Sequence, residues 1–153
     1  MPDEMNKEEA FNFLQQIVNL NIPYVAFSGG EPLLHPHFFE MCEFLRRNNV
    51  SLKVETNGEF IDERVAEKLA KLKFRSVQIS LDGATAKTHE KLRLAGNWEK
   101  AVTACRYLIK KGVNTEIVFV PTKFNIHETG PLIDFAYSLG VYGVYTGKMM
   151  RIG

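Results

Sequence analysis

Three segments of the sequence combine glycine with polar side chains that could hold a small ligand. They are Ser28-Gly-Gly-Glu-Pro32, Thr56-Asn-Gly58 and Ser80-Leu-Asp-Gly83. Glycine lets a ligand approach the backbone closely, and a carboxylate can accept hydrogen bonds from a cation such as an ammonium group. Each segment alone is equally typical of an ordinary turn. Together they supply acceptors and hydroxyl groups that suit an amino group and a ribose, namely Glu31, Thr56, Asn57, Ser80 and Asp82.

Each of these segments follows a short run of β-branched and aromatic residues and precedes a stretch with helical periodicity. We expect strands over residues 23–28, 51–56, 76–81, 114–120 and 141–146. We expect helices over residues 7–20, 37–47, 62–72 and 127–138, and a further helical stretch that ends near residue 111. Parallel strands need crossover connections, which helices usually supply. The alternation therefore predicts an α/β fold with a parallel sheet.

Two of the expected strands carry one polar and one apolar face, because side chains alternate along a strand. The polar faces consist of Lys53, Glu55 and Asn57 in one strand and of Gln78, Ser80 and Asp82 in the other. A doubly wound sheet has helices on both faces and would be almost continuously apolar. A complete TIM barrel fills its interior with apolar side chains and needs ~250 residues. The pattern favours a curved, incomplete barrel with helices on the outer face and a polar inner face that lines a cavity.

The composition limits the class of protein. A chain of 153 residues with 45% hydrophobic residues can form one domain with a core, and its net charge of +1 provides no general attraction for nucleic acid or an anionic membrane. Apolar stretches are far shorter than the ~20 residues that cross a bilayer, and the N-terminus is acidic, so we expect a cytoplasmic protein. The two cysteines, Cys42 and Cys105, are too distant in sequence for a disulfide framework or a thiolate metal site of usual spacing.

Four motifs, in order over residues 24 to 112, resemble the radical S-adenosylmethionine (radical SAM) enzymes. They are Tyr24-Val-Ala-Phe-Ser-Gly-Gly-Glu-Pro-Leu-Leu34, Val54-Glu-Thr-Asn-Gly58, Gln78-Ile-Ser-Leu-Asp-Gly83, and His89-Glu-Lys-Leu-Arg93 followed by Gly96-Asn-Trp98 and Ala101. Their spacing is similar to that of the branch with molybdenum-cofactor biosynthesis and other cofactor-maturation or peptide-modifying members. The resemblance implies a partial (β/α)6 TIM-like barrel that lacks its first strand, with residues 1–153 as a single core domain fragment.

The resemblance also implies S-adenosylmethionine as a cofactor. Gly29, Gly30 and Glu31, with Pro32, would hold the amino group of its methionine moiety. Arg93 would pair with the methionine carboxylate, for which a planar guanidinium is well suited, although a solvated helix charge is the alternative. Ser80 and Asp82 would contact the methionine or the ribose, and Thr56 and Asn57 the nucleoside or the substrate. No catalytic residue is implied, and residues 148–153 look like the last barrel strand and its glycine loop.

The sequence departs from the family at the iron-sulfur cluster. Family members bind a [4Fe-4S] cluster through a Cys-x3-Cys-x2-Cys loop upstream of Gly-Gly-Glu-Pro, and this sequence has no such loop. We expect Cys42 and Cys105 to be core residues and expect no metal ligand in this chain. Either the chain is a homologue that lost its cluster or it is a piece of a longer enzyme. The second is favoured because residues 2–10 look like the family's helix-capping segment, with Asn6 and Glu9 as a capping box.

The function that the resemblance implies is that of an iron-sulfur oxidoreductase. Its parent enzyme would cleave S-adenosylmethionine reductively to a 5′-deoxyadenosyl radical, which abstracts hydrogen from a small-molecule or peptide substrate. A donor such as ferredoxin or flavodoxin would supply the electron, and the isolated chain would be inactive. The alternative is a noncatalytic α/β nucleotide-binding or interaction module. His35 and His37 flank Pro36, and we interpret them as turn residues at the surface because no third ligand is near in sequence.

Overall fold

The computed structural model describes residues 5–93 and 95–147. Its strands are β1 (Tyr24–Phe27), β2 (Ser51–Thr56), β3 (Ser76–Ser80), β4 (Thr115–Phe119) and β5 (Gly143–Thr146). Its α-helices are α1 (Lys7–Asn19), α2 (Phe38–Arg47), α3 (Glu63–Lys71), α4 (Ala86–His89), α5 (Asn97–Lys110) and α6 (Thr129–Leu139), and the short 3-10 helices are η1 (Pro32–Leu34) and η2 (Ile126–Glu128). The residues that look like a last barrel strand, 148–153, lie outside the described part.

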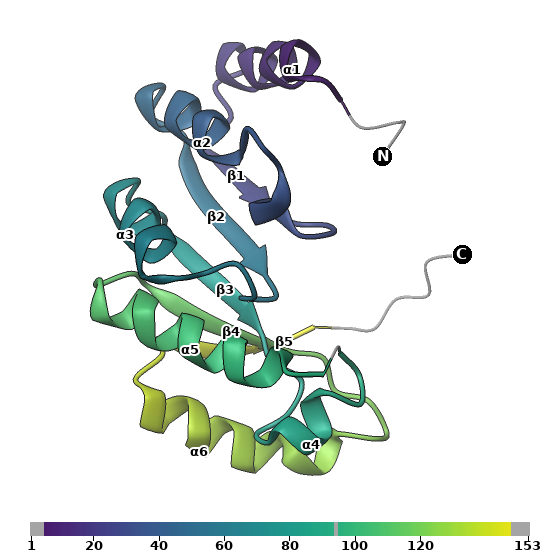
Figure 1. Cartoon of the computed structure of the whole chain (residues 1–153). Helices are drawn as coiled ribbons and strands as arrows, with labels where there is room; N and C mark the ends of the chain where they lie inside the picture. The colour runs from purple at the N-terminus through teal and green to yellow at the C-terminus, as the bar shows by residue number, and fades with distance from the viewer. Residues whose placement is uncertain (1–4, 94, 148–153) are drawn as a thin grey trace.

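The five strands form one sheet in the order β1-β2-β3-β4-β5, and every neighbouring pair is parallel. Figure 1 shows that the sheet curves and that α1, α2, α3, α5 and α6 all cover its convex side. A doubly wound sheet would reverse its strand order and place helices on both faces. The prediction of an α/β fold with a parallel sheet and helices on the outer face is therefore confirmed.

The hydrophobic core fills the layer between the sheet and the helices. Leu52 and Val54 of β2 and Val77 and Ile79 of β3 point into this layer and are completely buried. Lys53, between the two β2 core residues, points to the concave face of the sheet and is only partly buried. The alternation in the sequence thus decides which face of each strand packs against helices and which lines the inside of the curve.

Local sequence signals explain where the first helix begins. Asn6 accepts a hydrogen bond from the backbone N–H of Glu9 at 3.0 Å, and the Glu9 carboxylate accepts one from the N–H of Asn6 at 2.8 Å. This reciprocal capping box satisfies two N–H groups that the helix itself leaves without partners. The capping box expected at these two residues is confirmed.

The helical stretch expected before residue 111 consists of two helices, α4 and α5. Gly96 separates them in a left-handed conformation, with φ of 76°, and forms the N-terminal boundary of α5. Helical backbone cannot continue through this conformation, which glycine adopts at little cost. The segment between the two helices carries Arg93 and thereby moves that side chain to the carboxyl end of the sheet.

Among the described residues, none of the helices combines the length and the apolar composition that spanning a membrane requires.

Candidate functional site

The Gly-Gly-Glu-Pro segment and the Thr-Asn-Gly segment meet at the carboxyl ends of β1 and β2. One carboxylate oxygen of Glu31 accepts hydrogen bonds from Thr56 Oγ1 at 2.7 Å and from the backbone N–H of Leu33 at 3.2 Å. The other accepts from the N–H of Asn57 at 2.9 Å. A carboxylate has about four acceptor positions, so these three donors leave room for one more. Glu31 therefore joins the two segments and can still accept a hydrogen bond from a ligand.

The backbone before Glu31 is open on one side. Gly29 has a φ of 117°, a conformation that other residues rarely adopt, and a Cβ atom at Gly29 or Gly30 would meet no atom of the described residues within 4 Å. Packing against these residues therefore does not require glycine at position 30. A ligand that lies against the peptide groups is a physical reason for a side chain to be absent there. Pro32 follows as the first residue of η1, a position that needs no N–H donor.

Asp82 holds Arg93 in place at the end of β3. The Asp82 side chain is almost completely buried, and its Oδ2 accepts a hydrogen bond from Arg93 Nε at 2.8 Å. Its Oδ1 accepts from the backbone N–H of Val120, just after β4, at 3.1 Å. Both oxygens thus have partners from this chain. The carboxylate connects the end of β4 to the guanidinium, which makes Asp82 suited to orienting Arg93.

Arg93 lines two cavities at the carboxyl ends of the strands. One has a volume of about 490 Å³ and is also lined by Asn57, Glu59 and Asn97. The other has a volume of about 320 Å³ and is lined by Asp82, Val120 and other residues. The Arg93 Nη groups make no hydrogen bond to the residues that the structure describes. They are available to bind a carboxylate in a bidentate geometry.

Ser80 is the last residue of β3 and faces the concave side. It is partly buried, and within residues 5–93 and 95–147 its hydroxyl makes no hydrogen bond. A hydroxyl group can donate one hydrogen bond and accept two. Ser80 thus joins Glu31, Arg93 and the backbone of Gly29 and Gly30 as site residues that offer polar groups which the described residues leave unused.

His89 fixes the loop after β3 from the inside. The residue is completely buried. The ring atom Nδ1 accepts a hydrogen bond from the backbone N–H of Asp82 at 3.0 Å, and the ring atom Nε2 lies 2.9 Å from Asn97 Oδ1. An accepting Nδ1 carries no proton, so this network assigns the proton to Nε2, which donates to Asn97. Burial lowers the pKa of His89, against the opposing effect of the Asn97 hydrogen bond. The neutral imidazole therefore positions the Asp82 loop.

Acidification is expected to destabilise the protein through His89. The unfolded histidine has a pKa of about 6.5 and the folded one a lower pKa, so the stabilisation is complete above pH 6.5 and is lost progressively as the pH falls from that value through the folded pKa. In urea unfolding at pH 7.5, 6.5 and 5.5, the free energy of unfolding should decrease as the pH falls, and this decrease should be smaller in His89→Gln than in the unsubstituted chain. The exposed His127→Gln variant is the matched control and should follow the unsubstituted chain. Identical pH profiles for all three proteins would contradict this role.

Two residues after β4 were missed by sequence reasoning and also hold the loop after β3. Glu128 accepts hydrogen bonds from the Ala84 N–H at 2.6 Å and from the Thr88 hydroxyl. Burial would raise the pKa of Glu128, but these hydrogen bonds outweigh it and the pKa is lowered. Asn125 donates from Nδ2 to the backbone carbonyl of Asp82 at 3.0 Å. No local pattern marks either residue, because their partners lie about 40 positions away in the sequence.

The cysteines are placed as expected for core residues. Cys42 and Cys105 are both buried and free, and burial raises the pKa of both thiols, that of Cys105 to about 12. A cluster ligand must be a thiolate, which burial in apolar surroundings disfavours. No group of three or more His, Cys, Asp or Glu side chains suited to a metal ion occurs in the part of the chain that the structure describes. His35 and His37 are partly buried turn residues, and His37 pairs with Glu40 at 3.1 Å.

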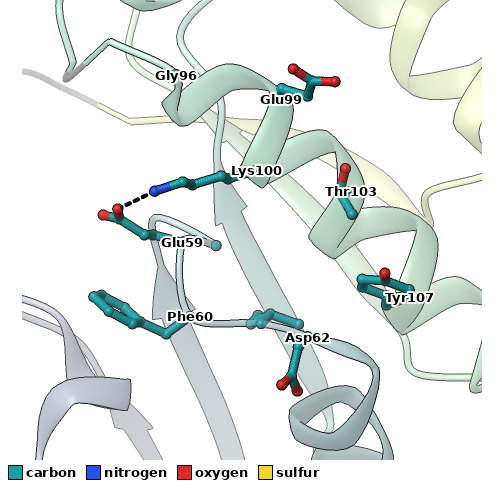
Figure 2. A pocket seen from close by; sticks show the side chains of 10 residues that line it. Glu59, Phe60, Asp62, Gly96, Glu99, Lys100, Thr103 and Tyr107 are labelled. Carbon is teal, nitrogen blue, oxygen red and sulfur yellow. Dashed lines mark hydrogen bonds and ion pairs between the residues drawn. The ribbon is translucent and has the colours of Figure 1, made fainter.

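A separate cavity of about 660 Å³ lies outside this site. Figure 2 shows it between the loop after β2, with Phe60 and Asp62, and the α5 residues Thr103 and Tyr107. An ion pair of 2.6 Å between Glu59 and Lys100 stands at one end. The cavity is lined by none of the nine site residues predicted from sequence. We therefore assign the candidate site to the strand ends and the Arg93 cavities.

Comparison with known proteins identifies the class. The Radical SAM superfamily matches residues 1–136, so the chain belongs to this superfamily, as the four motifs predicted. The chain is 35% identical over 143 residues to the mycofactocin maturase MftC of Mycobacterium ulcerans (strain Agy99), which covers 93% of this chain and 38% of that protein. It is 28% identical over 151 residues to the AdoMet-dependent heme synthase of Methanosarcina barkeri (strain Fusaro / DSM 804), covering 98% and 43%. The chain thus spans less than half the length of these curated relatives.

Solved structures share the fold. Streptococcus suis SuiB superposes with a TM-score of 0.84 at 18% identity, over 98% of this chain and 35% of that chain. The structure of anSMEcpe with bound AdoMet and the Cp18Cys peptide superposes with a TM-score of 0.80 at 25% identity, over 94% and 43%. These similarities agree with the sequential, all-parallel sheet that the strand order establishes.

Proposed function

We propose that the carboxyl ends of β1, β2 and β3 bind S-adenosylmethionine as part of a radical SAM enzyme. The observation that carries this proposal is the convergence at Glu31. Its carboxylate joins two motif segments, keeps an acceptor position free, and follows the open backbone of Gly29 and Gly30. Membership of the superfamily supports it. In this proposal residues 1–153 belong to one radical SAM core domain.

Each group of the ligand has a partner in this arrangement. The methionine amino group would donate to Glu31 and to the backbone of Gly29 and Gly30, and the methionine carboxylate would bind the free Nη groups of Arg93. Ser80 would contact the ribose or the methionine. Asp82, whose oxygens have partners already, would act by orienting Arg93. Thr56 and Asn57 would act by positioning Glu31.

The chemistry of the reaction depends on groups that this chain's described residues do not hold. In the family, S-adenosylmethionine bound to a reduced [4Fe-4S] cluster supplies a 5′-deoxyadenosyl radical. We propose that this chain lacks the cluster cysteines, because both of its cysteines are buried core residues with raised thiol pKa values. Its own residues bind and orient the cofactor. Treatment of the purified chain with iron and sulfide should yield no stoichiometric cluster, and a stoichiometric one would contradict the assignment.

The names of the relatives support a proposal for the substrate class. One is named a mycofactocin maturase and another a heme synthase, and SuiB has been solved with its precursor peptide SuiA. We propose a peptide or a cofactor precursor as the substrate of the complete enzyme. The reaction requires one electron, for which we propose a donor such as ferredoxin or flavodoxin. We also propose a cytoplasmic location for the enzyme.

Titration with S-adenosylmethionine tests the proposed site. In two-dimensional NMR spectra of the chain, the ligand should shift the signals of Gly29, Gly30 and Ser80. Gly30→Ala should weaken binding by about tenfold or more, because the added methyl group occupies the ligand's approach, while the stability changes little. The matched control is Gly112→Ala, on a surface turn far from the site, which should bind normally. Shifts confined to other parts of the chain would contradict the proposal.

The alternative is a noncatalytic nucleotide-binding module. One observation favours it, namely that Cys42 and Cys105 are buried and unsuited to bind an iron-sulfur cluster. The two functions differ in which part of the ligand is recognised. A module that reads the nucleoside should bind adenosine as well as S-adenosylmethionine. The site proposed at Glu31 and Arg93 requires the methionine moiety, so adenosine alone should leave the signals of Gly29 and Gly30 unchanged.

A further inference from the structure

A row of polar side chains crosses the concave face of the sheet below the proposed cofactor site. Glu55 of β2 is in register with Gln78 of β3, and Gln78 is in register with Glu116 of β4. Neighbouring strands lie about 5 Å apart, so these three side chains stand next to one another. Together with Lys53 of β2, which pairs with both glutamates, we call them the polar row. The proposed binding of S-adenosylmethionine involves none of these four side chains.

The charges within the polar row do not balance. Lys53 Nζ lies 3.6 Å from a Glu55 oxygen and 3.6 Å from Glu116 Oε2, so one ammonium is shared between two carboxylates. Both separations exceed the 2.7–3.2 Å of an N–H···O hydrogen bond. One negative charge is left in excess. Glu55 Oε2 also accepts a hydrogen bond from the Ser28 hydroxyl at 3.0 Å, whereas the lysine is too distant to satisfy either carboxylate fully.

Glu116 is the least compensated member of the row. It is only 8% exposed, and Gln78, which donates to its Oε2 at 3.3 Å, is 5% exposed. Burying a carboxylate is costly unless hydrogen bonds and an opposite charge compensate it. Within the described residues the second oxygen of Glu116, Oε1, has no hydrogen-bond partner. An oxygen without a partner, on a residue that is itself largely buried, favours contact with a further donor, preferably a cationic one.

An aromatic ring stands at the end of the polar row. Gly143 of β5 is in register with Glu116 and has no side chain. The ring of Tyr145 lies over it, because a Cβ atom built on Gly143 would meet Tyr145 Cε2 at 3.3 Å. Tyr145 is 46% exposed and so remains accessible. A cation beside Glu116 could contact both a carboxylate and an aromatic ring, a combination that favours positive charge.

We propose that the polar row and Tyr145 form a binding site for a cationic amine or guanidinium group of the substrate. The site lies two residues before Asn57 and Ser80 on the same faces of β2 and β3, which corresponds to a distance of about 7 Å along the strands. A substrate held there would thus lie next to the ligand at the strand ends. This inference extends the proposed function and rests on it in one respect, that the bound molecule is called a substrate. The binding site itself is argued from the geometry of the sheet alone.

Small cationic probes test the site in the full chain. The probes are acetyl-lysine methylamide, acetyl-arginine methylamide and, as the uncharged control with the lysine carbon chain but no ammonium group, acetyl-norleucine methylamide. The charged probes should shift the side-chain amide signal of Gln78, and norleucine should not. Of the two cations, the stronger binder identifies the amine or the guanidinium as the preferred group. Equal shifts by all three probes, or shifts only elsewhere on the chain, would overturn the proposal.

Two substitutions should change binding in opposite directions. Glu116→Gln, which keeps the shape and removes the charge, should weaken binding of the preferred probe at least threefold. Lys53→Met removes the ammonium that competes for the same carboxylates and should strengthen binding at least threefold. Glu67→Gln, an exposed carboxylate on α3, is the matched control and should have no effect. If Lys53→Met weakened binding, the charge argument would be wrong.

A parallel titration with S-adenosylmethionine separates this inference from the proposed function. Neither Glu116→Gln nor Lys53→Met should alter its binding, because the polar row lies below the strand ends. If the cationic probes did not shift the Gln78 signal while S-adenosylmethionine still bound, the cation site alone would be overturned. If the cationic probes shifted the Gln78 signal but S-adenosylmethionine did not bind, the proposed function would be overturned and the cation site would stand.

Discussion

Replacing Gly58 by alanine should lower the free energy of unfolding by about 2–5 kcal/mol. Gly58 has a φ of 80°, which costs other residues about 1–2 kcal/mol. An added Cβ would also lie 3.1 Å from the Ala101 Cα and 3.3 Å from the Ala104 Cβ of α5, and such overpacking costs about 1–3 kcal/mol. Urea unfolding followed by circular dichroism measures the difference. The Asn-Gly turn thus stabilises the contact between β2 and α5.

The matched control for this substitution is Gly112→Ala. Gly112 has a similar φ of 72°, but a Cβ there would meet no atom within 4 Å. It should therefore lose only the backbone contribution of about 1–2 kcal/mol. Equal losses at both positions would show that the contact with α5 contributes nothing, and that Gly58 is needed for its conformation alone.

Asp82→Asn should weaken the binding of S-adenosylmethionine by about tenfold to a hundredfold, through Arg93. Each Asp82 oxygen accepts from an N–H group, of Arg93 on one side and of Val120 on the other. An asparagine amide has one oxygen and one NH2 group, so a donor must face a donor in either orientation. A hydrogen bond to a charged group contributes about 1.5–3 kcal/mol, and each 1.4 kcal/mol is tenfold in affinity. Calorimetry or NMR titration provides the dissociation constants.

A double-mutant cycle tests whether Asp82 acts through Arg93. Arg93→Met should weaken binding at least as much as Asp82→Asn, and the double variant should bind no worse than Arg93→Met alone. Decarboxylated S-adenosylmethionine, which lacks the group that Arg93 is proposed to bind, should respond little to either substitution. Arg106→Met, an exposed arginine on α5, controls for the loss of a positive charge. If the two single effects were additive, Asp82 would contact the ligand directly.

The motifs of the sequence predicted most of the fold for a physical reason. Strand and helix periodicities are local, so the alternation of Leu52 and Val54 with Lys53 already defined the core and concave faces of β2. The family membership predicted from the four motifs is confirmed. Glycine and capping signals are also local, which is why the capping box at Asn6 and Glu9 could be predicted from residue types alone. The bounds of the elements differ slightly from expectation, and the last expected helical stretch before residue 111 is divided at Gly96 into two helices.

The partners of the site residues depend on the tertiary structure. The sequence presents Asp82 as a free carboxylate, but folding brings Val120 and Arg93 to it and uses both of its oxygens. Glu128 and Asn125 reach the same loop from about 40 residues away, a separation at which no local pattern carries information.

The polar row also depends on contacts between segments that are distant in the sequence. Its members are ordinary alternating residues in the sequence, and only the register of three parallel strands brings Glu55, Gln78 and Glu116 side by side. By itself, therefore, the sequence determined the family, the α/β class and which residues face inward, because these depend on short-range spacing. The tertiary structure decided which inward-facing groups remain free to bind a ligand, because that depends on contacts between distant segments.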